Sequence, residues 1–389
     1  MKYAVRTSSL SHKWEHVWTA LPHLNFNCSA FRSKSIFSEF VNDTLSHRNN
    51  DIKLTGIELT FKGAATASSV IKKSVNYAYM HNVTKLSVKW VTKKYIQFPQ
   101  ELFSSHTLKH FTLATNVQSY LLCKTSCVPK LAWDFPVLET LILKNIRLGD
   151  EGDESLDLFS KCVNLKDLTL HQCCMKGLNI LNIYASQLSD LTITQSLSLP
   201  NVFDVIAPQL KNVTASVKGT IDRFPVSFDT LRLATEGFDH LAEVNLSLLK
   251  PHYNRERFVP VLLDLFQTFR NAKTLIIDTA IIETLSLSPN RLSERSPFNE
   301  LNSLRINMAP LNQKEYIASM LTQVISNYLL ENSPDVTFIM DLPQDQLKRS
   351  RDRVDMETMA NKVPKLKAEK DNKHLMPKGR CPHPEAMPT

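Results

Sequence analysis

The 389-residue sequence is poor in glycine, with only 8 residues, and it lacks the short motifs of common catalytic sites. It contains no G-x-S-x-G, no H-E-x-x-H and no G-x-x-x-x-G-K-[ST]. So few glycines leave few places for a loop that holds phosphate groups. We therefore expect a protein that is not an enzyme and that needs no cofactor.

The sequence also lacks a run of about 18 apolar residues, the length that a membrane-spanning helix requires. FVPVLLDLFQTF at 258–269 is shorter and contains Asp264. The opening MKYAVRTSSLSHKW has no apolar core of the kind found in secretion signals. We therefore expect no membrane association, a cytoplasmic or nuclear location, and free thiols at the seven cysteines.

The formal net charge is +8, and residues 343–389 contribute to it with 11 Lys and Arg against 7 Asp and Glu. These residues contain no aromatic side chain, whereas sites for single-stranded nucleic acid combine cations with aromatics. This composition favours a solvated, disordered basic tail over a nucleic-acid site. KRSRDR at 348–353 is a weak candidate for a nuclear-targeting signal.

Two clusters of metal-ligating residue types do not have the spacing of metal sites. GDEGDESLD at 149–157 lacks the order of oxygen ligands and the glycine position of a calcium loop, so we expect a solvated loop. Cys123 and Cys127 precede an H-x-C-C stretch formed by His171, Cys173 and Cys174. Zinc sites usually pair two knuckles of regular spacing, so we expect core cysteines and no metal ligand.

A repeated pattern runs through the middle of the chain. Its five copies are LKHFTLATN, LETLILKNIRL, LKDLTLHQCCM, LSDLTITQS and LKNVTAS. Their first leucines stand at positions 108, 138, 165, 188 and 210, separated by 30, 27, 23 and 22 residues. The pattern matches the leucine-rich-repeat template L-x-x-L-x-L-x-x-N/C-x-L, and the spacing largely matches its period of about 20 to 29 residues.

The pattern predicts parallel strands that stack along the chain. In L-x-L both leucines point to one side of a strand, and one repeat cannot bury them without its neighbours. Weaker strand patterns occur at 57–61, 84–90, 230–234, 242–248, 273–278, 302–306 and 336–340, and helical patterns at 37–45, 70–80, 259–269 and 315–330. The predicted fold class is α/β, a leucine-rich-repeat solenoid with helical or irregular returns.

The order of sequence blocks resembles plant F-box proteins with leucine-rich repeats and an FBD-like C-terminal region. AVRTSSLSHKWEHVWTALPHLNF at 4–26 is similar to the second half of the F-box in that family. FSEFVNDTLSHRNNDIKLTGIELTF, VNYAYMHNVTKLSVKW, FPQELFSSHTLKHFTL, FPVLETLIL and LFSKCVNLKDLTLHQC follow in the order usual there, and LLENSPDVTFIM continues it. The resemblance covers residues 4 to 342.

This resemblance implies five segments. They are a partial F-box at 1–26, irregular repeats with helices at 27–107, leucine-rich repeats at 108–250, FBD-like helix and strand repeats at 251–342, and the basic tail at 343–389. The Leu-Pro segment that forms the first F-box helices in the family is missing, and Met1, Lys2 and Tyr3 stand in its place.

The resemblance further implies that the chain is the substrate-recognition subunit of a Skp-cullin-F-box ubiquitin ligase. Carried over from the family, the residues that would face the Skp adaptor or form the remaining F-box core are Val5, Leu10, Trp14 and Trp18. Trp14 and Trp18 lie one helical turn apart and could equally cap the end of the repeat stack. The alternative is a truncated repeat protein that binds targets but is uncoupled from the ligase.

Target recognition is expected on the strand positions between the leucines, because these line the concave face of a repeat stack. The candidates are His110, Thr112, Ala114, Thr140, Ile142, Lys144, Asp167, Thr169, His171, Asp190, Thr192 and Thr194. Threonine is common in strands for its β propensity alone, so we expect only a minority of these side chains to touch a target.

Overall fold

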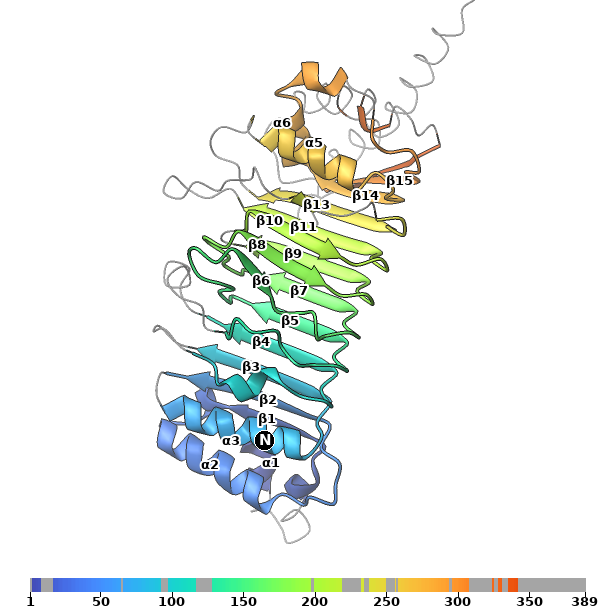
Figure 1. The fold of residues 1–389 in the computed structure, drawn as a ribbon. Helices are drawn as coiled ribbons and strands as arrows, with labels where there is room; N and C mark the ends of the chain where they lie inside the picture. Colours follow the sequence, from blue (N-terminus) through green and yellow to red (C-terminus); the bar gives the residue numbers. More distant parts are fainter. Residues whose placement is uncertain are drawn as a thin grey trace, which may run out of the picture.

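One long parallel sheet forms the body of the protein. The computed structural model describes residues 2–7, 17–63, 66–91, 97–116, 128–196, 199–218, 232–233, 238–249, 256, 258–293, 296–307, 324, 328–330 and 335–341. Twelve parallel strands follow one another across the sheet in chain order (Figure 1). The mixed α/β class and the stacking of parallel strands predicted from the sequence are confirmed.

The strands of this main sheet coincide closely with the sequence patterns. They are β1 (His23–Asn27), β2 (Gly56–Lys62), β3 (Lys85–Val91), β4 (His110–Thr115), β5 (Thr140–Lys144), β7 (Asp167–His171), β9 (Asp190–Ser196), β11 (Asn212–Lys218), β13 (Glu243–Leu249), β14 (Thr274–Asp278), β15 (Ser303–Asn307) and β16 (Thr337–Asp341). The sheet runs across the segment boundaries expected at 26/27, 107/108 and 250/251. Its strands therefore belong to one continuous stack from His23 to Asp341.

Buried apolar side chains line up from strand to strand. Leu141, Leu168 and Leu191 are register partners on β5, β7 and β9, and each is at most 2% exposed. Two residues further along, Leu143, Leu170 and Ile193 form a second buried row. Fully burying one such side chain stabilises the fold by about 1.5 to 3 kcal/mol. The leucine period in the sequence thus becomes two apolar ladders inside the core.

A second, smaller sheet packs on the far side of these ladders. Its strands are β6 (Ser155–Asp157), β8 (Ile180–Tyr184), β10 (Val202–Ile206) and β12 (Arg232–Leu233), in the order β12-β10-β8-β6. The repeat pattern predicted helical or irregular returns here, with a weaker strand at 230–234. The returns are extended instead, because alternating residues such as Leu181 and Phe203 bury one side of each strand.

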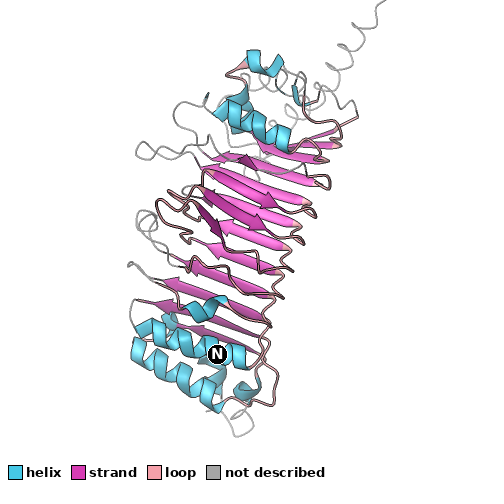
Figure 2. Cartoon of the chain, in the orientation of Figure 1, coloured by secondary structure: helices cyan, strands magenta, loops and turns pink. Residues whose placement is uncertain are grey.

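Helices gather at the two ends of the stack (Figure 2). α1 (Lys2–Thr7), α2 (Lys34–His47) and α3 (Thr66–Met80) lie near the first strands, and α5 (Phe258–Thr268) and α6 (Thr279–Leu285) lie near the last ones (Figure 1). The predicted helices at 37–45, 70–80 and 259–269 are confirmed. The helical pattern at 315–330 lies largely outside the described residues.

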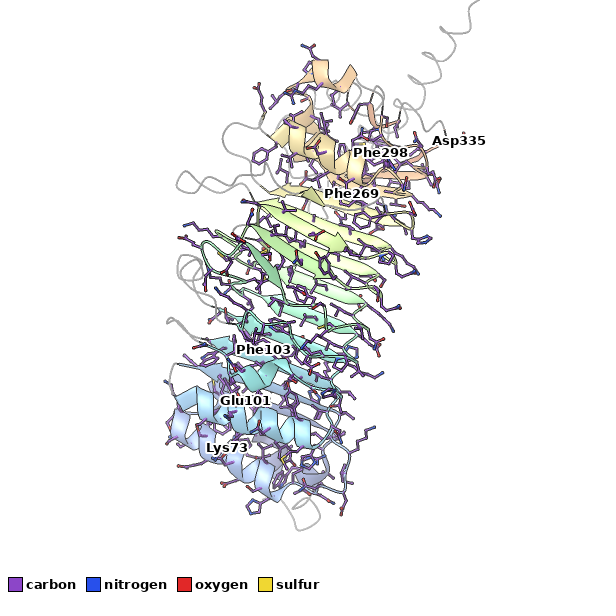
Figure 3. The ribbon with its side chains drawn as sticks, viewed as in Figure 1. Lys73, Glu101, Phe103, Phe269, Phe298 and Asp335 are labelled. Atoms are coloured by element: carbon purple, nitrogen blue, oxygen red, sulfur yellow. The ribbon has the colours of Figure 1, made fainter. Side chains whose placement is uncertain are left out.

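Helices α2, α3, α5 and α6, the second sheet and the buried rows of the main sheet share one hydrophobic core. Aromatic rings join its layers, for example Phe103 with Trp133 at 4.6 Å between centroids and Phe266 with Phe298 at 5.5 Å. Figure 3 shows Phe103 near the first strands and Phe269 and Phe298 near the last. These core-forming elements therefore pack on one face of the main sheet, and we call the opposite face, which none of them covers, the open face.

The chain has the same backbone conformation near the ends of three successive strands, β5, β7 and β9. Asn145, Gln172 and Gln195 follow Lys144, His171 and Thr194, and all three have positive φ, at 57°, 53° and 52°. Amide groups connect these positions, since the backbone N–H of Asn145 donates to the carbonyl of His171 at 2.8 Å and Gln172 Nε2 donates to Gln195 Oε1 at 3.1 Å. The positive-φ residue thus follows β5 and β7 directly and lies in β9 one residue before its end.

Candidate functional site

The predicted target-binding residues come together on the open face of the main sheet. They occupy β4, β5, β7 and β9, and parallel pairing sets them in three rows across these strands. His110 and Lys144 are exposed, and the other candidates of the three rows, except Ala114, are half-buried between their neighbours. Ala114 lies in the third row but is buried, at 8% exposure, because its methyl group is short. Ala114 thus lies on the predicted face but presents little surface to a partner.

The first row contains His110, Thr140, Asp167 and Asp190, and it holds two neighbouring carboxylates. Thr140 Oγ1 donates to Asp167 Oδ2 at 3.2 Å, and Asn212 Nδ2 donates to Asp190 Oδ1 at 2.7 Å. Partial burial, and secondly the negative charge of Asp190, raise the pKa of Asp167 above its usual value. This row can present an acidic, hydrogen-bonded spot to a partner.

The second row is formed by Thr112, Ile142, Thr169 and Thr192, and it carries no charge. Its side chains are half-buried, so their methyl groups and hydroxyls form the floor between the two outer rows. β-Branched side chains of this kind are favourable in strands. A partner could contact them through van der Waals packing and weak hydrogen bonds, and not through charge.

The third row contains Lys144, His171 and Thr194. His171 Nδ1 lies 2.9 Å from Thr194 Oγ1, a distance that fits a hydrogen bond. Partial burial, and secondly the positive charge of Lys144, lower the pKa of His171 below its usual value. The imidazole is therefore neutral near pH 7, and Lys144 is the cation beside it.

Charge changes sign along the open face. Lys85 precedes His110 in the first row, whereas Asp167, Asp190 and Glu243 follow on later strands. Lys89 and Lys144 flank Ala114 in the third row. The first half of the open face is thus more basic and the middle more acidic, which would orient a partner of complementary charge.

Several open-face residues belong to the same rows but were not among the sequence candidates. They are Lys85, Ser87 and Lys89 on β3 and Asn212 and Thr214 on β11. The alternation in TKLSVKW indicates the β3 residues, because Leu86, Val88 and Trp90 are the buried positions between them. The apolar pattern of LKNVTAS is too weak to predict that Asn212 and Thr214 of β11 lie in these rows.

The N-terminal candidates are only partly described. Val5 lies on α1 and is half-buried, and Trp18 lies on the short helix η2 (Val17–Ala20) and is also half-buried. Leu10 and Trp14 lie outside the described residues. Nearby, the guanidinium of Arg48 donates to the carbonyls of Leu21 at 3.3 Å and Ile52 at 2.7 Å, and so ties this segment to the start of the sheet.

The acidic loop and the cysteines contain no metal site in the described part of the chain. Lys130 Nζ pairs with Asp150 at 3.0 Å and with Asp153 at 2.9 Å, so a lysine binds the carboxylates of this loop. Cys173 and Cys174 are fully buried, which confirms them as core residues, whereas Cys123 and Cys127 lie outside the described residues. Among described residues no group of three or more His, Cys, Asp or Glu could hold a metal ion, and no helix is long and apolar enough to span a membrane.

The sequence of this chain is similar to those of plant F-box proteins with leucine-rich repeats. An F-box/LRR-repeat protein of Arabidopsis thaliana is 24% identical over 298 residues, which are 73% of this chain and 63% of that protein. The relatives of this chain are thus plant F-box/LRR-repeat proteins. F-box/LRR-repeat protein 25 of the same plant is 29% identical over 170 residues, 43% of this chain and 59% of that protein.

An FBD-associated F-box protein of Arabidopsis is 26% identical over 197 residues, which are 50% of this chain and 40% of that protein. The chain thus spans less than two thirds of the length of each of these F-box relatives. No protein-family model and no solved structure matches the sequence.

Proposed function

We propose that this chain is the substrate-recognition subunit of a Skp-cullin-F-box ubiquitin ligase, built as a leucine-rich-repeat solenoid and acting in the cytoplasm or nucleus. The names of the relatives, which combine F-box with LRR repeat, support the class of function. The in-register rows of half-buried and exposed side chains on the open face support target binding there. These rows are the single observation on which the target site rests.

The mechanism is proximity, and it needs no catalytic side chain in this chain. A target held on the open face is kept near the ubiquitin-loaded partner, which raises the effective concentration of the reacting groups. Specificity depends on Asp167 and Asp190 in the acidic spot and on Lys144 in the third row, because charged groups reject mismatched partners.

The N-terminal segment 1–26 is proposed as the adaptor-facing part, with Val5, Leu10, Trp14 and Trp18 as its contacts. Co-expression and pull-down with a plant Skp adaptor test this assignment. The chain should retain the adaptor, and Trp14→Ala or Trp18→Ala should release it. A second version with a complete Leu-Pro-type F-box half fused before Lys2 provides the positive control.

Binding by the fused version alone would contradict coupling of this polypeptide to the ligase. The repeat protein would then bind targets without ubiquitination, which is the alternative function. A fluorescent fusion tests the proposed location, since exclusion from both cytoplasm and nucleus would contradict it.

Target binding is tested separately from adaptor binding. Thr169→Arg places a long cation in the middle row, whereas Val163→Arg changes an exposed residue, at 52% exposure, in the loop between β6 and β7. Proteins that accumulate when the receptor is removed should be captured by the wild type and by Val163→Arg but lost with Thr169→Arg. Equal capture by all three would place the target elsewhere.

A further inference from the structure

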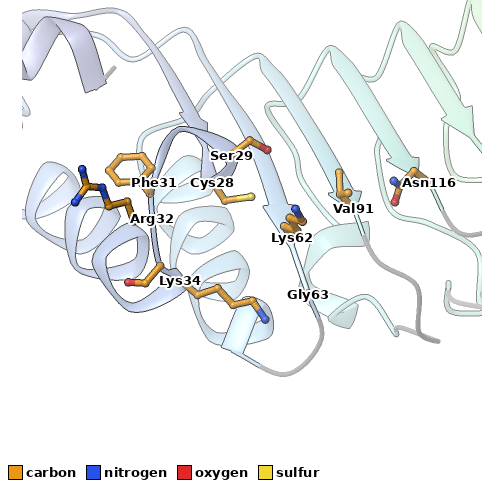
Figure 4. Close-up of a pocket in the computed structure, with 10 residues that line it drawn as sticks. Cys28, Ser29, Phe31, Arg32, Lys34, Lys62, Gly63, Val91 and Asn116 are labelled. Atoms are coloured by element: carbon orange, nitrogen blue, oxygen red, sulfur yellow. The ribbon is translucent and has the colours of Figure 1, made fainter.

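A pocket lies at the carboxyl ends of the first four strands, outside the rows predicted from the sequence. Its volume is about 650 Å³, and it lies between the segment that follows β1 and the ends of β2, β3 and β4 (Figure 4). Cys28, Phe31 and Lys34 come from the first segment, and Lys62 and Val91 end β2 and β3. The volume is in the range of sites for small organic molecules, which is about 300 to 1,000 Å³.

Cations border this pocket without acidic neighbours. Arg32, Lys34 and Lys62 are among its lining residues, which include no Asp or Glu. None of these three side chains forms an ion pair with any residue that the structure describes. Lys34 and Lys62 lie on the side of Gly63, and Arg32 lies on the other side next to Phe31 (Figure 4). The charge on this pocket wall is therefore positive, and no described acidic residue pairs with it.

The remaining lining is largely apolar. Phe31 is half-buried and packs against Phe37 and Phe40, with ring centroids 5.4 Å and 4.9 Å apart, so its ring is fixed by the core. Val91 adds an aliphatic surface, and burial raises the pKa of the Cys28 thiol, which keeps this sulfur uncharged near pH 7. A ligand that fits the pocket needs an apolar body as well as a negative charge.

Gly63 makes room for one of the two lysines. Its φ is +103°, and a Cβ atom at this position would collide with the ammonium group of Lys34. The backbone of Gly63 is held on both sides, since its N–H donates to the carbonyl of Val91 at 3.0 Å and its carbonyl accepts from Trp90 Nε1 at 2.7 Å. The end of β2 thus has a defined shape against which Lys34 lies.

We propose that this pocket binds a small organic anion, whose carboxylate or phosphate lies between Lys34 and Lys62 and whose apolar body packs on Phe31 and Val91. Ammonium groups bind such anions as point charges without requiring one fixed geometry. The apolar wall adds affinity that an inorganic ion could not gain. This assignment does not depend on the proposed ligase function.

Calorimetric titration of the full chain with biphenyl-4-yl phosphate tests the proposal. Biphenyl-4-ylmethanol provides the apolar body without the charge, and inorganic phosphate provides the charge without the body. Biphenyl-4-carboxylate distinguishes a phosphate site from a carboxylate site. The two aromatic anions, or one of them, should bind at least about tenfold more tightly than either partial ligand, a factor that corresponds to 1.4 kcal/mol.

Charge variants locate the binding site. Lys34→Gln and Lys62→Gln should each weaken binding about threefold and the double variant about tenfold, in keeping with the modest energy of exposed charge pairs. Lys85→Gln is the matched control, because it removes an exposed cation from the opposite end of β3 and should leave binding unchanged. Far-UV circular dichroism verifies that all variants fold.

Three results would overturn the proposal. They are no binding of either aromatic anion, equal binding of the neutral alcohol, and an equal loss of affinity in Lys85→Gln and Lys62→Gln. The first would mean that the pocket has no such ligand, the second that charge is irrelevant, and the third that only the net charge of the protein matters.

Discussion

Asp278 caps the start of α6 and is partly buried, and its burial makes its ionisation costly. Its carboxylate accepts the backbone N–H of Ile281 at 2.9 Å at the start of α6 and that of Leu248 at 2.7 Å. Burial is nevertheless the largest influence, and it raises the pKa of Asp278 to about 6. The folded protein therefore holds this proton up to a higher pH than the unfolded chain does.

The first prediction concerns the pH dependence that follows. Between about pH 4 and pH 6 the folded state binds more protons at Asp278 than the unfolded state, so this carboxyl group destabilises the fold as pH rises through that window. Asp278→Asn removes the effect. Relative to this variant, the wild type should lose about 1 to 3 kcal/mol between pH 4 and pH 7, with the lower end allowing for solvent at the half-buried carboxyl.

Urea unfolding of both proteins at the two pH values measures this loss. The Asn side chain also changes the hydrogen bond to Leu248, but that cost is the same at both pH values. A stability difference that stays constant with pH would show that Asp278 ionises normally in the folded protein.

Two glycines in the acidic loop region provide a matched pair for the second prediction. Gly152 and Gly177 both have positive φ, at 91° and 80°. A Cβ at Gly152 would meet nothing within 4 Å, whereas one at Gly177 would lie 2.7 Å from Cα of Glu151. Gly152→Ala should thus cost about 1 kcal/mol for the backbone conformation alone.

Gly177→Ala should cost at least about 1 kcal/mol more than Gly152→Ala, because a backbone atom cannot move aside as a side chain can. The N–H of Gly152 also donates to the carbonyl of Gly177 at 3.1 Å, so the two turns would have to shift together. The midpoints of thermal unfolding compare the two variants, and equal midpoints would contradict the steric argument.

At the scale of one element, β7 separates stability from recognition on its two faces. Leu170 is fully buried in the core, and Thr169 next to it lies half-buried on the open face. The third prediction is that Leu170→Ala destabilises the fold by about 2 to 5 kcal/mol, because it leaves a cavity between the sheets. Thr169→Ala should cost less than about 1 kcal/mol.

Denaturant unfolding of the two variants checks this difference. A small loss of stability in Thr169→Ala would also support the target-binding test. It would indicate that substitution of Thr169 changes the surface of the sheet and not the fold. Similar destabilisation by both substitutions would mean that the open face is packed in the folded protein.

In the whole molecule, each strand of the main sheet pairs only with the strands next to it. Stability of such a stack is approximately a sum of repeat terms and interface terms. The fourth prediction is that Leu170→Ala increases amide hydrogen exchange mainly in β5, β7 and β9. β1, β2, β15 and β16 should keep their protection.

Hydrogen exchange followed by mass spectrometry measures this distribution along the chain. A uniform increase in all described strands would show that the stack unfolds as one cooperative unit. The Phe and Trp contacts between layers, such as Trp133 with Phe159 at 6.0 Å between centroids, are local and favour the graded response.

The sequence by itself determined the repeating strands of this protein. A strand has a side-chain period of two, and a lone repeat cannot bury its leucines, so L-x-L at regular spacing specifies parallel stacking. The same period predicts that Thr140, Thr169 and Thr192 point away from the buried leucines, and in the structure they lie on the open face. These conclusions require only local geometry and a count of residues.

Tertiary structure alone decided how the returning segments pack and where the pocket lies. The strands β6, β8 and β10 gain their partners from repeats more than 20 residues away, and no local pattern separates them from an irregular return. Lys34 and Lys62 come from different segments and line one pocket only because parallel strands end at one edge and Gly63 leaves space for Lys34 there. Distances across a fold depend on packing between segments, and a local sequence period does not contain them.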